Sequence, residues 1–373
     1  MEKQVYGKRL SALRNNLEQG SAGKYDTAWI IQPENRRYCS GYSAEDTQCN
    51  ESSGSLLISG EGALLVTDSR YTLLAENEAS DFSVRTLKSG FMDDFPGLVK
   101  EMGTKTLGFE GECLPWKKHS ELTGKLAALS PPVTLAPMDS VIEEMREIKE
   151  ETEIRALKAA ALMISRILDE LFSSLKPGMT ELEAAWEIER LAKAAGADGL
   201  SFPPIVASGP NGALPHAEPS SRKLRQGEPV IVDAGVKLNG YCSDITRTVF
   251  LGHPDSQFVD IYRTVRKAQL EALKSVKPHM QSVDLDFTAR NLIKEAGYGD
   301  YFGHSLGHGV GLATHEGPRV GPRNSVTLKP GNVITIEPGI YIPGKGGVRL
   351  EEMVWITETG PEILTVCNHF YDL

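Results

Sequence analysis

The stretch VDAGVKLNGYCSDITRT, residues 232–248, predicts two β-strands joined at the dipeptide Asn239-Gly240. Asn-Gly is the strongest short-range signal for a two-residue hairpin turn, because both residues tolerate a positive φ. Such a turn sets the register of the strands it joins, so Leu238 should pair with Tyr241. The segment therefore predicts a β-hairpin whose pairing can be counted outward from the turn.

Two aspartates occupy this hairpin where core residues would be expected. Counting back from the turn places Gly235 opposite Asp244, and Asp233 lies two residues from Gly235. Side chains two residues apart share one face of a strand, so Asp233 and Asp244 lie on the same face, one diagonal step apart. The hairpin thus gathers two carboxylates in an apolar setting.

The C-terminal part of the chain repeats this arrangement. Five matched features occur in the same order in two copies, which favours a duplicated helix–helix–hairpin unit over chance. The pairs are KPGM (176–179) with KPHM (277–280), Ala-Gly at 195–196 with 296–297, HAEP (216–219) with HEGP (315–318), LRQGEPVIVDAG (224–235) with LKPGNVITIEPG (328–339), and Gly240–Asp244 with Gly347–Glu351. The alignment matches Asp233 with Glu337 and predicts a second acidic hairpin, in which Glu337 and Glu351 are symmetric about Gly344.

Four carboxylates between two hairpins would repel one another and could not all stay ionised without cations. Two divalent metal ions would neutralise the set. Oxygen ligands with one or two imidazoles favour manganese, iron, cobalt or zinc over copper, and a two-metal site can activate a water and polarise a carbonyl. Taken singly, each acid would be assigned to the surface. Their matched positions in the apolar runs IVDAG and ITIEPG favour the metal site.

Three of the eight histidines lie in HSLGHGVGLATHEGP, residues 304–318. His304 and His308 are four apart, but HSLGH lacks the glutamate of an HExxH zinc helix, and its glycines indicate irregular backbone. His308, flanked by glycines that allow close approach, is the better metal ligand. His216 and His315 occupy matched places in the two repeats and could donate to a substrate carbonyl or carboxylate, or shuttle protons. The remaining histidines, His119, His253, His279 and His369, have no such context and are assigned structural roles.

Residues 1–140 alternate helix and strand signals, which predicts an α/β N-terminal domain over residues 1–142. Strands are expected at 27–32, at 54–68 as two strands about Gly60-Glu61-Gly62, and at 82–87, 106–110 and 133–137, with one helix carrying Leu10, Leu13 and Leu17 and another following Pro115.

The second domain, residues 143–373, opens with a charged and strongly helical run from 143 to 175. Its apolar residues follow the 3,4 spacing of a helix with one buried face, and Pro177-Gly178 ends it. Thr180 with Glu183 predicts a capping box on the next helix, which Gly196 closes.

Composition narrows the classes of function. The 373 residues carry a formal charge of −10, which argues against binding nucleic acid or an anionic membrane. No apolar run is long enough for a transmembrane helix, and the N-terminus lacks the apolar core of a signal peptide. Five scattered cysteines, Cys39, Cys49, Cys113, Cys242 and Cys367, without CxxC spacing indicate free thiols and a cytoplasmic location, with neither a disulfide framework nor a zinc knuckle.

Both parts of the chain resemble known protein families. Residues 145–365 resemble the pita-bread metallopeptidases, a group that includes methionine aminopeptidase, aminopeptidase P and prolidase. The N-terminal part, with NRRYCSGY and LLVTDSRYTLLA, resembles the creatinase/prolidase N-terminal domain. That combination fits the aminopeptidase P and prolidase branch. It implies an α/β N-terminal domain, an α+β pita-bread catalytic domain with an internal pseudo-duplication, and a homodimer.

The resemblance also implies a ligand set. Asp233 would bind one metal, Asp244 and Glu351 would bridge both, and His308 and Glu337 would hold the second. A hydroxide between the two ions, manganese first with cobalt, zinc or iron as alternatives, would attack the scissile carbonyl, with Glu337 as the proton acceptor. The implied reaction is hydrolysis of an Xaa-Pro bond in a proline-containing dipeptide or peptide.

Other residues match the family around the metals. His216, His304 and His315 match histidines that contact substrate and stabilise the intermediate, and Arg349 matches the arginine beside the bridging glutamate, where its natural partner is an ionised carboxylate. Phe202 sits where an aromatic lines the pocket. Two departures, His279 for glycine and Glu352 for a frequent aspartate, leave the implied ligand set intact.

The sequence also bears on alternative functions. A metal-free creatinase-like hydrolase and a catalytically inactive interaction module both predict lost ligands, whereas all five remain here. Dipeptidase and aminopeptidase activities stay open. Arg319, four residues after His315, could grip the carboxylate of a dipeptide, or it could be an ordinary surface arginine.

Overall fold

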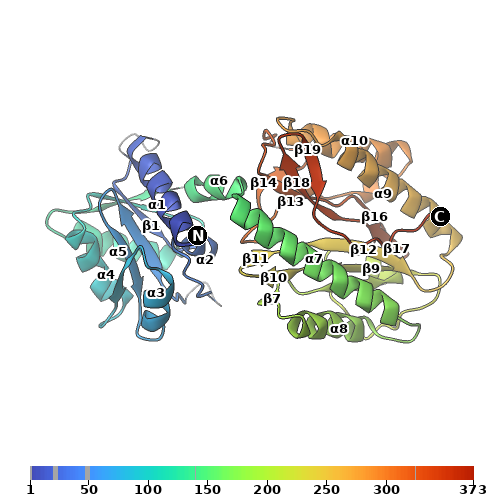
Figure 1. Ribbon diagram of the computed structural model, residues 1–373, viewed down its shortest axis with the longest axis horizontal. Helices are drawn as coiled ribbons and strands as arrows, with labels where there is room; N and C mark the ends of the chain where they lie inside the picture. Colours follow the sequence, from blue (N-terminus) through green and yellow to red (C-terminus); the bar gives the residue numbers. More distant parts are fainter. Residues whose placement is uncertain (1, 20–23, 47–50, 139, 324) are drawn as a thin grey trace. The chain divides into compact units, whose positions relative to one another are not determined.

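The computed structural model describes residues 2–19, 24–46, 51–138, 140–323 and 325–373. The chain divides into two compact units, Met1–Met145 and Arg146–Leu373 (Figure 1). The boundary expected between residues 142 and 143 falls inside α6 (Val141–Glu147). Each unit has its own sheets and its own core.

The first unit is built on a mixed sheet. Within the described residues it has six strands in the order β4-β3-β2-β1-β5-β6, with parallel pairing at β3–β4, β1–β5 and β5–β6. Strand β1 is buried along its whole length, as expected of a sheet covered on both faces, so the predicted α/β class is confirmed. The elements are α1 (Glu2–Gln19), β1 (Thr27–Ile30), α2 (Pro33–Ser40), β2 (Ser55–Ser59), β3 (Ala63–Thr67), α3 (Thr72–Glu78), β4 (Ser83–Thr86), α4 (Phe91–Glu101), β5 (Thr106–Phe109), α5 (Trp116–Ala127) and β6 (Thr134–Pro137).

The second unit contains two helix pairs and several antiparallel sheets. Helix α7 packs beside α8, and α9 beside α10 (Figure 1). The helical elements are α7 (Glu151–Ser174), α8 (Glu181–Ala194), η1 (Gly209–Ala213), α9 (Ser256–Ser275), α10 (Ser282–Glu295) and η2 (Gly299–Tyr301). The strands are β7 (Gly199–Leu200), β8 (Ile205–Ser208), β9 (Pro229–Ala234), β10 (Val236–Leu238), β11 (Tyr241–Cys242), β12 (Ile245–Phe250), β13 (Gly307–Gly309), β14 (Glu316–Val320), β15 (Val333–Ile336), β16 (Gly339–Ile342), β17 (Gly346–Arg349), β18 (Glu352–Thr357) and β19 (Gly360–Ile363).

Backbone hydrogen bonds repeat in the two copies and confirm the internal duplication. In the first copy the amide of Gly178 donates to the carbonyl of Leu224 at 2.9 Å. In the second copy the amide of His279 donates to the carbonyl of Leu328 at 2.7 Å. Gly178 and His279 both have a positive φ, 92° and 66°. The non-glycine residue in KPHM therefore adopts the same left-handed turn as the glycine in KPGM.

The first hairpin has the register expected from its turn. Leu238 pairs with Tyr241, and the turn residues Asn239 and Gly240 have φ of 51° and 81°. Farther out, β12 pairs with β9 in the same frame, which places Thr246 opposite Asp233. Asp244 is therefore one diagonal step from Asp233, as predicted.

The second hairpin also follows the predicted frame. Gly339 pairs with Arg349 in β16–β17, and Ile336 pairs with Glu352 in β15–β18. Both pairs are symmetric about residue 344, so Glu337 and Glu351 face one another between the two ladders.

The expected helix over residues 143–175 is wrong in one respect, because it is two helices. Helix α6 ends at Glu147 and α7 begins at Glu151. Between them the amide of Lys149 donates to the carbonyl of Gly331 at 2.9 Å, which takes it out of a helical ladder. Glu150 then caps α7 in a capping box with Glu153. Glutamate is an uncommon N-cap, so the helix-favouring composition hid the break.

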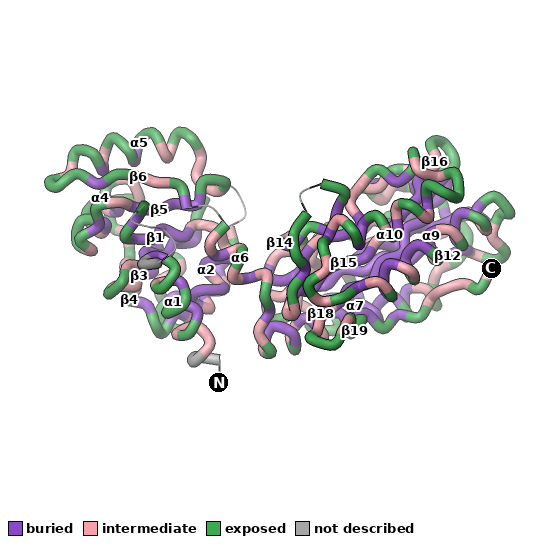
Figure 2. Tube along the Cα trace, turned by 90° about the horizontal axis from the view of Figure 1, so that it is seen from above, coloured by how far each residue is buried: buried purple, intermediate pink, exposed green. Residues whose placement is uncertain are grey.

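Among the described residues of the second unit, the buried apolar side chains form three clusters. Figure 2 shows the buried strands β12 and β15 running between helices that expose their outer faces. Of the five cysteines, Cys39, Cys113, Cys242 and Cys367 are free thiols, as expected, and Cys49 lies outside the described residues. The capping box at Thr180 and Glu183 is also confirmed.

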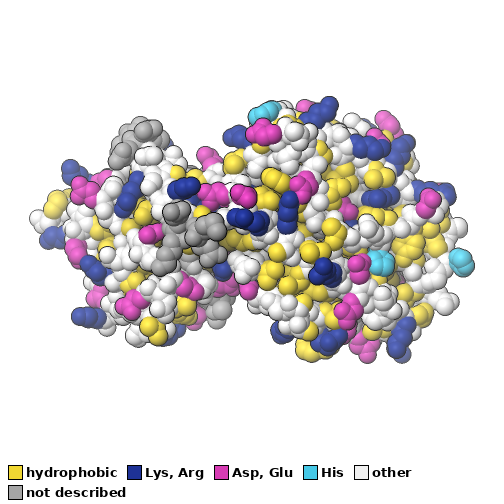
Figure 3. Space-filling view, in the orientation of Figure 1, with side chains coloured by type: hydrophobic (Ala, Val, Ile, Leu, Met, Phe, Trp, Pro, Cys, Tyr) yellow, Lys and Arg dark blue, Asp and Glu magenta, His cyan; other side chains and the backbone are white. Residues whose placement is uncertain are grey.

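The surface is mixed in charge. On the face drawn in Figure 3, the described Lys and Arg side chains are interspersed with Asp and Glu. Among the described helices, none combines the length and apolar character needed to cross a bilayer.

Candidate active site

The eleven predicted site residues line one cavity of the second unit, with a volume of about 650 Å³. They are Phe202, His216, Asp233, Asp244, His304, His308, His315, Arg319, Glu337, Arg349 and Glu351. They come from both repeats, so the cavity lies between the two matched hairpins. Asp244, Arg349 and Glu351 are buried at its floor, whereas His216, His315 and Arg319 are exposed at its mouth.

Three metal-ligating groups meet at the floor. One ligand atom from each of Asp244, His308 and Glu351 lies within 4.8 Å of the other two. The Nε2 atom of His308 is 3.7 Å from Asp244 Oδ2 and 3.5 Å from Glu337 Oε1. Glu337 therefore lies beside this cluster, on the side of the imidazole.

Glycines bring His308 into this position. His308 is the central residue of β13 and is flanked by Gly307 and Gly309. A Cβ at Gly307 would overlap the carbonyl oxygen of Thr335, and a Cβ at Gly309 would overlap that of Gly317. Because neither glycine has a side chain, neighbouring backbone can approach β13 closely.

Asp233 is held by an arginine rather than by the cluster. Arg349 Nη2 donates to Asp233 Oδ2 at 2.6 Å, and Arg349 Nη1 donates to the hydroxyl of Tyr341 at 2.9 Å. The same hydroxyl lies 2.9 Å from His304 Nε2. A continuous polar chain thus runs from Asp233 through Arg349 and Tyr341 to His304.

The electrostatics of the floor are those of crowded, buried acids. Burial raises the pKa of Asp244 well above its usual value, and the charges of Glu351, Asp233 and Glu337 raise it further. Burial likewise raises the pKa of Glu351, and it raises that of Glu337 to about 8, with Arg349 opposing the shift. A cation would reverse these shifts, because it stabilises the ionised carboxylates.

Burial favours the neutral form of three histidines in the cavity, His304, His308 and His315. Burial lowers the pKa of His308 to about 4 and that of His304 to about 4. Burial and the neighbouring His216 lower the pKa of His315. A neutral imidazole is the form that ligates metals and accepts protons.

The donor set fits divalent cations. Asp233 Oδ1 is buried and has no hydrogen-bond partner among the described residues, which leaves one carboxylate oxygen available to a cation. The hydroxyl of Thr246 donates to Glu351 Oε2 at 2.7 Å, and that of Thr335 donates to Glu337 Oε1 at 3.3 Å. Each of these carboxylates therefore has one oxygen oriented by the protein, as supporting groups orient ligands in metal sites.

Tyr341 is a site residue that the sequence reasoning missed. Its ring lines the cavity, and burial raises the pKa of its hydroxyl to about 12, so the group stays protonated. The register about Gly344 pairs Tyr341 with Gly347, two residues from the pair Gly339 and Arg349. The counting that placed Glu337 opposite Glu351 could also have placed Tyr341 on the face of Arg349.

Glu316 was missed for a different reason. It accepts from Arg146 Nη2 at 2.5 Å and from Lys149 Nζ at 2.6 Å, with its side chain 7% exposed. Burial would raise the pKa of Glu316, but the two cations more than offset it, and the net shift is downward. The partners are separated from it by about 170 positions in sequence, and no local pattern links them.

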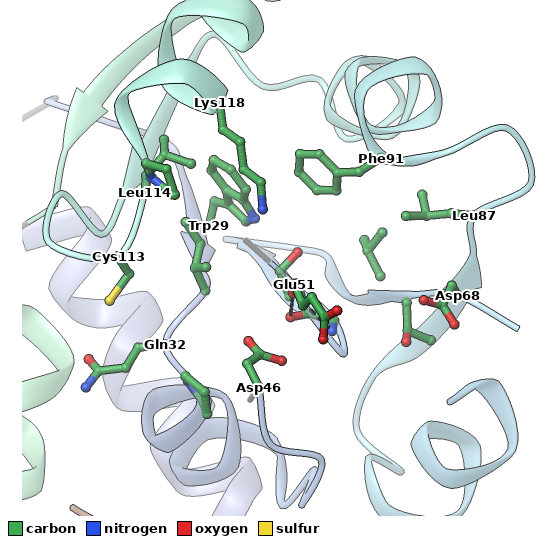
Figure 4. A pocket seen from close by; sticks show the side chains of 18 of the residues that line it. Trp29, Gln32, Asp46, Glu51, Asp68, Leu87, Phe91, Cys113, Leu114 and Lys118 are labelled. Carbon is green, nitrogen blue, oxygen red and sulfur yellow. Dashed lines mark hydrogen bonds between the residues drawn. The ribbon is translucent and has the colours of Figure 1, made fainter. Parts of the chain in front are cut away.

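A larger cavity, of about 1030 Å³, lies in the first unit (Figure 4). Its walls include Trp29, Phe91, Leu87 and Leu114, and its lining contains none of the predicted site residues. The candidate site is therefore chosen by its converging acids and imidazoles, not by the size of the cavity.

Comparisons with known proteins match both parts of the chain. The model of Metallopeptidase family M24 matches residues 155–358, and that of the Creatinase/Prolidase N-terminal domain matches residues 9–148. An Xaa-Pro dipeptidase of Pyrococcus horikoshii is 39% identical over 340 residues, 91% of this chain and 92% of that protein.

Solved structures give the same result. An Xaa-Pro dipeptidase from Bacillus anthracis has a TM-score of 0.90 at 34% identity, over 99% of both chains. An X-Pro aminopeptidase from Thermotoga maritima has a TM-score of 0.83 at 36% identity, over 96% of this chain and 97% of that one. The two-domain pita-bread fold predicted from the sequence is confirmed.

Proposed function

We propose, from the premise that this chain belongs to metallopeptidase family M24, that it hydrolyses Xaa-Pro bonds with two divalent metal ions. The observation that carries the proposal is the meeting of Asp244, His308 and Glu351 at one buried floor. Asp233 and Glu337 line the same cavity and extend the donor set to five residues. The Xaa-Pro specificity is inferred from the names of relatives. Two Xaa-Pro dipeptidases and an X-Pro aminopeptidase match nearly the whole chain.

The five residues divide into three sets. Asp233, whose Oδ1 has no hydrogen-bond partner within the described part of the chain, would hold one ion. His308 and Glu337 would hold the other, while Asp244 and Glu351 would contact both. When bound, the ions would polarise the scissile carbonyl and lower the pKa of a water held there. Neither alternative drawn from the sequence, a metal-free hydrolase or an inactive module, accounts for this complete set.

The residues above the floor bind and orient the substrate. His216 and His315 are exposed at the mouth, where their ring N–H groups can donate to the carbonyl oxygens of an entering peptide. His304 is oriented by the hydroxyl of Tyr341, and Phe202 contributes an apolar wall. Glu337 accepts the proton released during attack, because its carboxylate lies in the cavity beside His308.

Arg319 favours a dipeptide as the substrate. It lines the cavity that also contains the exposed His315, and its Nε donates to Ser305 Oγ at 2.9 Å, which restrains the side chain. A guanidinium there can bind a carboxylate in a bidentate manner. The C-terminal carboxylate of an Xaa-Pro dipeptide is the group it would meet.

The experiment uses protein stripped with a chelator and reloaded with one metal at a time. Manganese should restore hydrolysis of an Xaa-Pro dipeptide, with cobalt, zinc and iron compared at equal concentration, and an Xaa-Ala dipeptide should stay uncleaved. Full activity in protein shown by elemental analysis to be metal-free would refute the proposal. Cleavage of Xaa-Ala at the same rate would refute the proline specificity.

A second assay separates the two peptidase classes. An Xaa-Pro dipeptide and an Xaa-Pro-Yaa tripeptide are compared in wild type and in Arg319→Gln. If the protein is a dipeptidase, Arg319→Gln should raise KM for the dipeptide by about 10-fold, the change expected when one charge-assisted hydrogen bond is lost. Efficient tripeptide cleavage, unaffected by the substitution, would assign the protein to the aminopeptidases.

The homodimer and the cytoplasmic location stay predictions. Light scattering on the purified protein tests whether it is a homodimer.

A further inference from the structure

Three metal-ligating side chains of three chemical types converge away from the active-site cavity. Asp169 lies on α7, whereas Cys367 and His369 lie in the segment after β19. One ligand atom of each lies within 4.8 Å of the other two, and His369 Nε2 is 3.2 Å from Asp169 Oδ1. We propose that Asp169, Cys367 and His369 form a second kind of metal site, selective for zinc-like ions.

The backbone that carries Cys367 is held on both sides. The amide of Val366 donates to Ser165 Oγ on α7 at 3.0 Å. Arg247 donates to the carbonyl of Cys367 from Nε at 3.2 Å and from Nη2 at 2.6 Å. A ligand on an anchored backbone loses little conformational entropy when it binds a metal, so the site is partly preorganised.

The imidazole is oriented as well. The ring of Phe172, one turn from Asp169 on α7, packs edge-on against that of His369 with centroids 4.7 Å apart. This contact and the carboxylate of Asp169 hold the imidazole beside the thiol. The side chains of His369 and Asp169 are 39% and 50% exposed, whereas Cys367 is 1% exposed. The site therefore opens to solvent on its carboxylate and imidazole side, which gives an ion an entry path.

The ligand types select the ion. A thiolate, an imidazole and a carboxylate are the three donors that zinc accepts at tetrahedral geometry, with the fourth position open to water. Manganese prefers oxygen donors and binds thiolate poorly. The sulfur thus distinguishes this site from the floor of the active-site cavity, whose candidate ligands are carboxylates and one imidazole.

The ligands at this site would neutralise a bound divalent ion. Binding of a divalent ion forms a metal–sulfur bond and releases the thiol proton to solvent, so the site exchanges one proton for two positive charges. The ion would be balanced by two anionic ligands, the thiolate and Asp169.

The site would tie the C-terminal segment to α7. Arg247, which holds the carbonyl of Cys367, also donates to the carbonyl of Glu351 at 2.5 Å and to Glu352 Oε1 at 2.8 Å. An ion at Cys367 would therefore restrain the same arginine that supports the backbone at Glu351. The expected effect is a higher unfolding temperature of the loaded protein.

Cobalt is the probe, because a thiolate bound to Co²⁺ gives a charge-transfer band in the near ultraviolet that carboxylates and imidazoles do not give. Titration of the stripped full-length protein with Co²⁺ should produce this band with a stoichiometry of one per chain, and Zn²⁺ should displace it. Cys367→Ser should abolish the band, and His369→Ala should weaken cobalt binding by at least ~10-fold, the smallest loss expected even for an outer-shell partner.

Two matched controls keep the test specific. Cys113→Ser removes a thiol of the first unit and should leave the band unchanged. Glu170→Gln neutralises an exposed acid next to Asp169 and should bind cobalt as wild type, whereas Asp169→Asn should bind it at least ~10-fold more weakly. A wild type without the band, a band that persists in Cys367→Ser, or equal affinity in His369→Ala and wild type would each overturn the proposal. None of these outcomes depends on peptidase activity.

Discussion

Arg349 Nη2 lies 2.6 Å from Asp233 Oδ2, and both side chains are buried at the floor of the active-site cavity. Arg349 also donates from Nε to Thr246 Oγ1 at 3.1 Å, and that hydroxyl donates in turn to Glu351. One guanidinium therefore orients carboxylates from both repeats. It is a positioning residue for the proposed metal ligands.

Replacement of this guanidinium should weaken the site even when the charge is kept. Arg349→Lys retains the charge but loses the planar fork, and Arg349→Met loses both. We expect kcat/KM to fall by about 10–100-fold in the lysine variant and further in the methionine variant, as for losses of groups that orient metal ligands. Equal activity in wild type and Arg349→Lys would show that charge alone is needed.

Asp244→Asn should separate stability from activity. The neutral side chain removes one of several mutually repelling acids, so the metal-free variant should unfold at a higher temperature than metal-free wild type. Turnover should fall by at least ~10²-fold, because Asp244 is a ligand of both ions in the proposed site. The exposed Asp260→Asn is the control and should change neither property. A metal-free variant less stable than wild type would contradict the repulsion on which this prediction depends.

Gly307→Ala tests the close approach at His308. The added Cβ would overlap the carbonyl oxygen of Thr335, which is backbone and cannot rotate away. We expect a loss of about 1–3 kcal/mol in the free energy of unfolding, as for other overpacked sites, together with a lower metal affinity. Denaturant unfolding and metal titration measure the two effects.

Gly303→Ala is the matched control, because a Cβ there meets nothing within 4 Å. It should behave as wild type in both measurements. If the two alanine variants are equally stable and bind metal equally well, the glycines at β13 have another role.

The ion pairs of Glu316 should make stability depend on pH at the acid side. The pKa of Glu316 is lower in the folded protein than in the unfolded chain, because Lys149 and Arg146 more than offset the effect of burial. The unfolded state then binds more protons than the native state, so this contribution is complete above the unfolded pKa and is lost as the pH falls through the folded pKa.

Glu316→Gln should therefore cost about 3–5 kcal/mol at pH 7, since it leaves two buried cations without their carboxylate. The difference from wild type should shrink as the pH falls below about 4.5. Thermal unfolding at a series of pH values measures it, and a difference independent of pH would exclude the ion pairs as its source. Glu362→Gln, which removes an exposed ion pair with Lys158, is the control and should change stability by less than about 1 kcal/mol.

Much of the fold could be read from local patterns. The turn at Asn239-Gly240 fixed the register of the first hairpin, and symmetry about Gly344 fixed that of the second. The break between α6 and α7 could not be read, because it depends on a hydrogen bond from Lys149 to Gly331, almost two hundred residues away. Local propensity favours helix on both sides of that break, and a tertiary contact overrides it.

The sequence by itself determined which carboxylates would meet. A period of two along each strand, counted from a turn, assigns every side chain to a face, so Asp233 and Asp244 in one hairpin and Glu337 and Glu351 in the other needed no structure to be paired. Tertiary structure alone decided the contacts between elements without a shared register. These include Arg349 on Asp233, Glu316 on Arg146 and Lys149, and Asp169 beside Cys367 and His369. The physical reason is that a hairpin register is a local constraint, whereas packing of a helix against a distant segment depends on the whole core.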